Sequence, residues 1–132
     1  MPTHLTQIPR WLPAVFLMAV IFAFSSIPGN DMPGFGIFDL LVKKGGHALG
    51  YALLALAILN WISPLWGKSP PPRKTLFLAW VLTVLYAASD EFHQSFVPGR
   101  MASLLDVLID AIGAFLGLVA YKFWQKPARQ SD

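Results

Sequence analysis

Four apolar stretches separated by short polar connections dominate this chain of 132 residues. They cover residues 11–27, 45–66, 75–89 and 104–124. A helix needs about 20 residues to cross a bilayer, because each residue adds about 1.5 Å along the axis. The first and third stretches are shorter, so their polar ends are expected to enter the headgroup region. The pattern predicts an all-α membrane protein, a bundle of four transmembrane helices.

The third span is expected to extend beyond its apolar stretch. Arg73 and Lys74 mark its start at one membrane face, and about 20 residues from there reach residues 92–94. We therefore predict spans at about residues 11–27, 45–66, 75–94 and 104–124, within a single domain that covers residues 1–132.

The composition supports a membrane protein and excludes several other classes. Hydrophobic residues make up 55% of the chain and charged residues 13%, whereas soluble domains carry about 25% charged residues. The basic residues lie at the ends of the apolar stretches and form no stripe with interleaved aromatics, so no nucleic-acid partner is predicted. The chain has no cysteine, which excludes disulfides and thiolate chemistry.

The distribution of charge predicts the orientation. With four spans, both termini and the proline-rich connection before the third span share one side of the membrane. Seven of the ten basic residues belong to that side: Arg10, Lys68, Arg73, Lys74, Lys122, Lys126 and Arg129. Basic residues mark the cytoplasmic side of membrane proteins. Both termini are therefore predicted to be cytoplasmic, with most of the acidic residues toward the outside.

A polar segment at the outer end of the third span holds most of the reactive side chains. It runs from residue 90 to residue 100 and includes Asp90, Glu91, His93, Gln94 and Arg100. Ionisable groups at the end of a membrane span cost free energy and usually serve a function. We interpret this segment as part of a site.

Helical spacing adds residues from two other spans. Lys44, His47 and Tyr51 share one face near the outer end of the second span, and Asp106 and Asp110 share one face of the fourth. Asp110 lies 12 residues before Lys122, which is roughly 18 Å of helix. It is therefore expected inside the hydrocarbon layer, facing the bundle interior and either paired or protonated.

Several of these residues also have purely structural interpretations. Ser103 and Asp106 match a capping box at the start of the fourth span. Arg100 either neutralises Asp90, Glu91 or Asp106, or binds an anionic group of a ligand. His47 on its own is typical of a hydrogen-bonded interfacial histidine.

No metal site or cofactor is predicted. The residues with suitable nitrogen or oxygen ligands are His47, His93, Asp90, Glu91 and Asp106. However, the chain has no H-E-x-x-H segment or other closely spaced set of ligands.

Gly113 and Gly117 follow Asp110 on the fourth span at steps of three and four. They are expected to let this span approach a neighbouring helix closely.

Most of the site residues discussed so far belong to four motifs: Phe24-Ser25-Ser26 followed by Pro28-Gly29, Lys44-x-x-His47-x-x-x-Tyr51, Asp90-Glu91-x-His93-Gln94-x-Phe96-Val97-Pro98-Gly99-Arg100, and Ser103-x-x-Asp106 leading into Gly113 and Gly117.

In these motifs the sequence resembles the VanZ-like membrane proteins, a family named for an accessory gene of glycopeptide-antibiotic resistance. The resemblance covers residues 20–120. At position 110 the family pattern more often has asparagine. The resemblance implies a small multi-pass protein of the bacterial cytoplasmic membrane, with an influence on susceptibility to lipid-bearing cell-wall antibiotics such as teicoplanin. It does not supply a reaction.

We predict an accessory envelope protein whose outward-facing polar site binds a lipid headgroup, a lipid-linked cell-wall intermediate or a lipoglycopeptide. Arg100 is expected to bind the anionic group, while acidic and amide side chains meet hydroxyls or amides. The predicted ligand-binding residues are Arg100, Gln94, His47, Tyr51, Lys44 and Asp110.

Two alternatives stay open. The first is a membrane hydrolase or transferase that acts on a headgroup by acid–base chemistry, with His93, Glu91, Asp90 and Asp106 as its catalytic candidates. No serine lies in a nucleophile-elbow context, which favours binding over acyl transfer. The second is a structural or partner-binding bundle in which the polar residues only fix the packing of the helices.

Overall fold

The computed structural model describes residues 8–31, 34, 36–66 and 70–125. In this part of the chain all regular structure is helical. Four α-helices follow one another: α1 (Leu12–Ser25), α2 (Ile37–Ile62), α3 (Arg73–Gln94) and α4 (Leu104–Trp124). Short 3-10 turns, η1 (Gly29–Asp31) and η2 (Ser63–Trp66), follow α1 and α2. The predicted all-α fold with four helices is confirmed.

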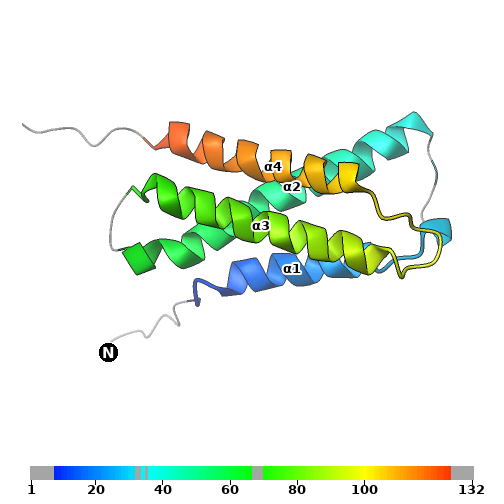
Figure 1. Ribbon diagram of the computed structural model, residues 1–132, viewed down its shortest axis with the longest axis horizontal. Coiled ribbons are helices and arrows are strands. Elements are labelled where there is room, and N and C mark those ends of the chain that lie inside the picture. The colour runs from blue at the N-terminus through cyan, green and yellow to red at the C-terminus, as the bar shows by residue number, and fades with distance from the viewer. Residues whose placement is uncertain (1–7, 32–33, 35, 67–69, 126–132) are drawn as a thin grey trace, which may run out of the picture.

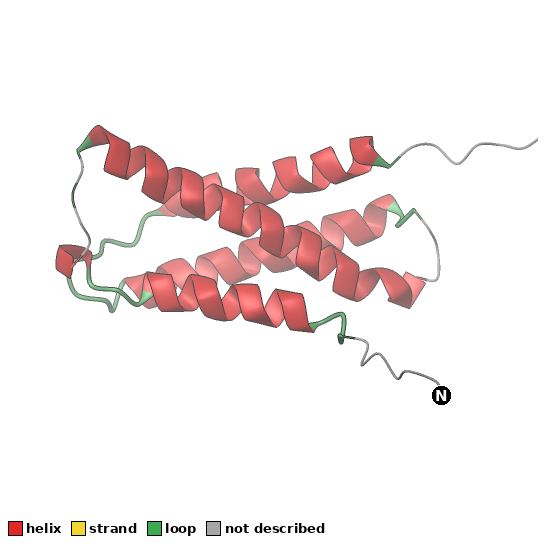
Figure 2. Ribbon diagram, turned by 180° about the vertical axis from the view of Figure 1, so that it is seen from behind, coloured by secondary structure: helices red, strands yellow, loops and turns green. Residues whose placement is uncertain are grey.

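The helices form one bundle in which each helix runs opposite to the next (Figure 1). α2 is the longest and crosses the other three obliquely, as the view from behind shows (Figure 2). α1 begins and α4 ends at the same end of the bundle. The opposite end gathers the end of α1, the start of α2, the end of α3 and the start of α4, and it carries the polar residues discussed below.

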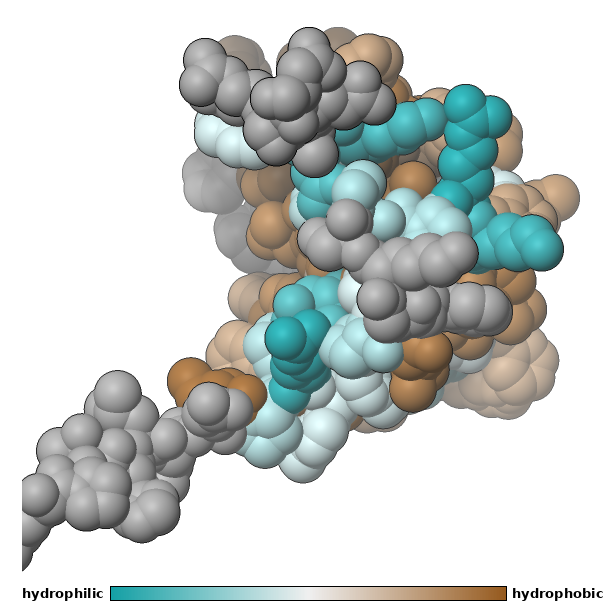
Figure 3. All heavy atoms as spheres, turned by 90° about the vertical axis from the view of Figure 1, so that its left-hand side faces the viewer, coloured by the Kyte–Doolittle hydropathy of each residue, from teal (hydrophilic) through white to brown (hydrophobic). Residues whose placement is uncertain are grey.

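The surface of the bundle fits a bilayer. α2 with its following turn, α3 and α4 are each long and apolar enough to cross a membrane, while α1 is a shorter apolar helix of 14 residues. Large apolar side chains such as Phe16, Leu53, Phe77 and Phe115 are exposed on the helix flanks. Seen from the end where α3 begins, hydrophilic side chains gather at the tip and brown apolar ones surround it (Figure 3). This is a multi-pass membrane protein.

The predicted helix bounds need one substantial correction. α2 begins at Ile37, eight residues before the predicted start at residue 45. The extra turns contain three charged residues, so hydropathy alone missed them, but the Lys43 Nζ atom lies 2.6 Å from Asp39 Oδ2 one turn away. Such a pair supports a helix. The start follows Gly36, whose φ of 66° suits glycine.

The other bounds differ little from the prediction. α1 covers Leu12–Ser25 where residues 11–27 were predicted, α3 begins at Arg73 where residue 75 was predicted, and α4 coincides with residues 104–124. The predicted orientation stays a prediction. Three of the basic residues on which it rests, Lys68, Lys126 and Arg129, lie outside the described residues.

The core is apolar in its middle and joins all four helices. α3 is tied to its neighbours by two side-chain hydrogen bonds: the Trp80 indole N–H donates to the Ala111 carbonyl at 2.9 Å, and the Tyr86 hydroxyl donates to the Met18 carbonyl at 2.6 Å. The buried apolar side chains around them are Ala14, Tyr51, Leu54, Ala55, Ala57, Ile58, Leu59, Ile62, Ala79, Ala87, Ala114 and Leu118.

The closest helix contact is between α2 and α4, and glycine makes it possible. A Cβ atom added at Gly113 would lie 2.4 Å from the Ala48 carbonyl oxygen and 2.8 Å from the Ala48 Cα. A Cβ at Gly117 would lie 3.0 Å from the Ala52 Cβ. The prediction that these glycines allow close approach to a neighbouring helix is confirmed.

Gly113→Ala should therefore destabilise the bundle, because its methyl group would push α4 away from the α2 backbone. We expect a loss of about 1–3 kcal/mol, measured as a lower midpoint of thermal unfolding in detergent. Gly46→Ala is the matched control, since nothing lies within 4 Å of a Cβ at Gly46. Alanine there should be neutral or stabilise α2 by up to about 1 kcal/mol. Equal midpoints for the two variants would contradict this account of the contact.

Candidate functional site

A cavity of about 260 Å³ opens at the polar end of the bundle, between the start of α2, the end of α3 and the start of α4. The loops that follow α1 and α3 complete its wall. Charged and polar side chains dominate the lining, but three apolar residues also belong to it. The lining residues are Gly29, Leu40, Lys43, Lys44, His47, Glu91, Gln94, Gly99, Arg100, Met101, Asp106, Ile109 and Asp110.

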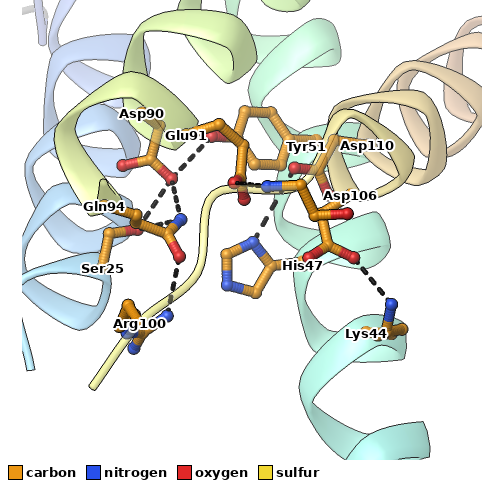
Figure 4. Close-up of polar contacts among 11 residues, drawn as sticks. Ser25, Lys44, His47, Tyr51, Asp90, Glu91, Gln94, Arg100, Asp106 and Asp110 are labelled. Atoms are coloured by element: carbon orange, nitrogen blue, oxygen red, sulfur yellow. Dashed lines mark hydrogen bonds and ion pairs between the residues drawn. The ribbon is translucent and has the colours of Figure 1, made fainter. Parts of the chain in front are cut away.

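Asp90 lies behind the cavity wall and accepts three hydrogen bonds on its Oδ2 atom. The donors are the Ser25 hydroxyl at 2.7 Å, the Tyr51 hydroxyl at 3.1 Å and the Gln94 side-chain amide at 3.1 Å. They come from α1, α2 and α3. Asp90 therefore joins three helices through one carboxylate (Figure 4).

Arg100 connects this cluster to the end of α1. Its Nη1 atom donates to the Gln94 carbonyl oxygen at 2.9 Å, so Arg100 reaches Asp90 through Gln94. Its Nε and Nη2 atoms donate to the main-chain carbonyls of Ile27 and Phe24 at 3.0 and 2.9 Å. Carbonyls at the end of a helix lack partners within the helix. The guanidinium thus holds the loop after α3 against the end of α1.

A close backbone contact strengthens the same junction. The Gly29 N–H donates to the Pro98 carbonyl at 3.0 Å, and a Cβ at Gly29 would lie 2.0 Å from the Gly99 oxygen. Gly99 has a φ of 74°, a conformation that glycine adopts readily. The two loops can touch here because both residues lack side chains.

Glu91 holds the start of α4. Its Oε2 atom accepts a hydrogen bond from the Ser103 main-chain N–H at 2.9 Å. The capping-box interpretation of Ser103 and Asp106 is wrong, because the Ser103 side chain makes no cap hydrogen bond. Asp106 instead accepts a hydrogen bond from Lys44 Nζ at 2.7 Å, an ion pair between α4 and α2.

His47 and Asp110 face each other at the bottom of the cavity. The His47 Nδ1 atom lies 3.8 Å from Asp110 Oδ2, and the imidazole also stacks on the Tyr51 ring with a centroid separation of 6.3 Å. Asp110 is only 2% exposed. This agrees with the expectation that it faces the bundle interior.

His93 lies apart from the cavity. Its ring stacks on Phe22 at 4.4 Å between centroids, and its Nε2 atom lies 3.0 Å from the Ser26 hydroxyl oxygen. Both partners belong to α1 or its end. His93 thus packs between α3 and α1, on a different side of α3 from Glu91 and Gln94.

The structure does not favour a metal centre. Within residues 8–31, 36–66 and 70–125, no group of three or more His, Asp or Glu side chains has an arrangement that could hold a metal ion. The five residues considered as ligands from the sequence are divided between the cavity, the cluster behind it and the α1 side of α3.

The family model described as VanZ/LLP1 matches residues 10–125. The chain belongs to the VanZ/LLP1 family. No curated protein and no solved structure is significantly similar to it.

In this VanZ/LLP1 protein the residues proposed from the sequence fall into three places. The cavity lining includes Lys44, His47, Glu91, Gln94, Arg100, Asp106 and Asp110. Asp90 and Tyr51 lie behind it in the hydrogen-bonded cluster, and His93 lies on the α1 side.

Two residues gained importance only from the structure. Ser25 is fully buried and supports Asp90, and Lys43 lines the cavity. Ser25 belongs to a motif that matched the family, and that match was the one signal available for it. Lys43 directly precedes Lys44 of the family motif, and no pattern in the sequence marked it separately as a cavity residue.

Ser25→Ala should weaken the buried Asp90 cluster, because it removes the shortest hydrogen bond to a carboxylate that is only 3% exposed. We expect a loss of about 1–3 kcal/mol, read from thermal unfolding in detergent. Ser89→Ala is the control, since Ser89 is exposed and its hydroxyl donates only to the Tyr86 carbonyl in the same helix. If both variants melt together with the wild type, Ser25 does not support the cluster.

Proposed function

We propose that the protein is an accessory protein of the bacterial envelope that binds the polar headgroup of a lipid or a lipid-linked ligand in the cavity at the end of the bundle. Membership of the VanZ/LLP1 family supports the general role in the envelope. The ligand is proposed from the geometry of the cavity alone.

One observation carries the proposal: charged side chains from three helices converge on one cavity at the end of a membrane bundle. A bundle that needed only mechanical stability would gain more from apolar packing there, because each buried charge has a desolvation cost. The position suits a headgroup, since helix ends lie at the headgroup level. The apolar lining residues Leu40, Met101 and Ile109 offer contacts for the first atoms of a lipid tail.

The cations at the mouth supply the binding site for an anionic group. Lys43 and Lys44 line the cavity, and their side chains keep 40% and 36% of their surface exposed. Arg100 lines the same wall. Ammonium and guanidinium groups make strong, charge-assisted hydrogen bonds to phosphate and carboxylate oxygens. A phosphate at the mouth would thus meet the two lysines of α2, since Arg100 already donates to the Gln94 side chain and two main-chain carbonyls.

The enzyme alternative has weaker support. A hydrolase needs a base next to the reacting atom. Of its four candidates, Glu91 and Asp106 line the cavity, whereas Asp90 lies behind it and His93, the first candidate, packs against α1. None of the described lining residues is a serine or threonine. Arg100 contacts main-chain carbonyls and Gln94, which favours a holding role over stabilisation of a reacting oxyanion.

We also propose that the cavity faces the outside of the cell and that both termini are cytoplasmic. The support is the sequence rule for basic residues, together with the exposed Arg73, Lys74 and Lys122 at the opposite end of the bundle. A lipid ligand from the outer leaflet would then enter the cavity directly.

Native mass spectrometry of the protein purified in mild detergent tests binding. The wild type should retain a lipid of defined mass, and Lys44→Ala should lower the retained fraction about tenfold, which corresponds to about 1.4 kcal/mol. Lys74→Ala is the matched control, because this exposed lysine lies at the other end of the bundle. It should retain lipid like the wild type. Thermal unfolding of each variant checks that the fold is intact.

The same experiment separates the alternatives. A retained lipid whose mass does not change on incubation supports binding, whereas conversion to a product identifies an enzyme. A wild-type protein that retains no lipid, or an equal loss in both lysine variants, would overturn the proposed site.

A further inference from the structure

The cavity is electrically polarised along its depth. Its inner part contains carboxylates that are almost completely shielded: Asp110 is 2% exposed and Glu91 is 6% exposed, and Asp90 directly behind them is 3% exposed. The cations stand farther out, because Lys43 and Lys44 keep more than a third of their side-chain surface exposed. A ligand that enters therefore meets the Lys43–Asp39 and Lys44–Asp106 ion pairs first and the shielded carboxylates last.

Neutral donors supply the hydrogen bonds that Asp90 and Glu91 accept. Asp90 accepts hydrogen bonds from two hydroxyls and an amide, and Glu91 accepts one from a main-chain N–H. The two lysines are paired with other acids, Lys43 with Asp39 and Lys44 with Asp106. At the inner end, His47 is the ionisable donor that faces Asp110, and its Nδ1 atom stays 3.8 Å from the Asp110 Oδ2 atom. The inner end of the cavity is thus rich in acceptors.

Asp110 lines the cavity and lacks hydrogen-bond donors within the described part of the chain. Its Oδ2 atom lies 3.8 Å from His47 Nδ1, beyond hydrogen-bond distance. Its Oδ1 atom is buried and has no hydrogen-bond partner among the described residues. An unsatisfied acceptor buried in this way is costly. Because Asp110 lines the cavity (Figure 4), a donor carried by the ligand can reach this carboxylate.

The chemistry of that donor follows from the carboxylates. The described residues offer no arrangement for a metal ion, so the missing positive charge is best supplied by an organic cation. A primary ammonium group fits, because it brings one positive charge and three N–H donors. A quaternary ammonium brings charge but no donor, and a hydroxyl brings a donor but no charge.

On the basis of the proposed function, we infer that the cavity is selective for a headgroup with a primary ammonium beyond an anionic phosphate, the chemistry of phosphoethanolamine. The ammonium enters first and binds Asp110, with Glu91 beside it. The phosphate stays at the mouth near Lys43 and Lys44. In this pose the ammonium lies among the shielded carboxylates, and the phosphate lies beside the lysines of the two ion pairs.

Binding of defined probes to the purified full chain tests the inference. The probes are dioleoyl phosphatidylethanolamine, phosphatidylcholine and phosphatidylglycerol in detergent, with bound fractions read by native mass spectrometry. The wild type should bind the ethanolamine lipid about tenfold more tightly than the other two, because only that lipid offers a charged N–H donor. Asp110→Asn should remove this preference while it still binds phosphatidylglycerol like the wild type.

Two controls keep the result interpretable. Asp39→Asn removes a carboxylate that lies outside the cavity lining but pairs with Lys43. It should change the binding of all three lipids by a similar factor and keep the preference. Glu91→Gln provides a second test at the inner end if Asp110→Asn lowers the thermal midpoint. Free phosphoethanolamine is a further probe: weaker binding than the intact lipid assigns the ligand to the membrane, and equal binding assigns it to a soluble compound.

Failure of the inference differs from failure of the proposed function. If the wild type binds all three lipids equally, or Asp110→Asn keeps the preference, the selectivity is wrong while headgroup binding stands. If the wild type binds none of the three probe lipids and retains no other lipid, both the selectivity and the proposed headgroup binding are overturned.

Discussion

The Asp90 carboxylate holds the polar end of the bundle together, because its Oδ2 atom accepts hydrogen bonds from α1, α2 and the last turn of its own helix. Through Gln94 this cluster extends to Arg100, which in turn binds main-chain carbonyls at the end of α1. The polar end of the bundle is thus held by a continuous series of hydrogen bonds. The cavity depends on this series, since it fixes Glu91 and Gln94 in its wall and positions the loop that closes it.

The second constraint is the close packing of α2 on α4. Gly113 and Gly117 bring the α4 backbone against Ala48 and Ala52. Asp110 lies one turn before Gly113, on the same face, and His47 directly precedes Ala48. The small residues therefore set the distance at which the polar side chains of the two helices meet. A wider spacing would separate Lys44 from Asp106 and His47 from Asp110.

Hydropathy and helical spacing predicted the number of helices, the bounds of α4 and the convergence of α2, α3 and α4 on one polar site. They failed where tertiary contacts decide. Hydropathy did not find the first turns of α2, because three charged residues interrupt their apolar side chains. The polar segment 90–100 grouped His93 with Gln94, but neighbouring residues point about 100° apart on a helix, and the His93 ring packs on Phe22 of α1.

Two further features had no local signal. Ser103 has the sequence of a cap, yet Glu91 from another helix satisfies its N–H, and no sequence pattern reports that competition. Ser25 follows an apolar run and would ordinarily be a helix end. Its role exists only because α3 brings Asp90 against it.

The shortness of α1 has a consequence for the surrounding lipid. A helix of 14 residues extends only about 21 Å, against about 30 Å for the hydrocarbon layer. We expect the bilayer to be thinner around α1, since lipids compress to match a short hydrophobic surface. Local thinning would bring the lipid phosphates closer to the level of Ser25 and of the cavity mouth. A lipid would then reach the cavity with its headgroup without leaving its leaflet.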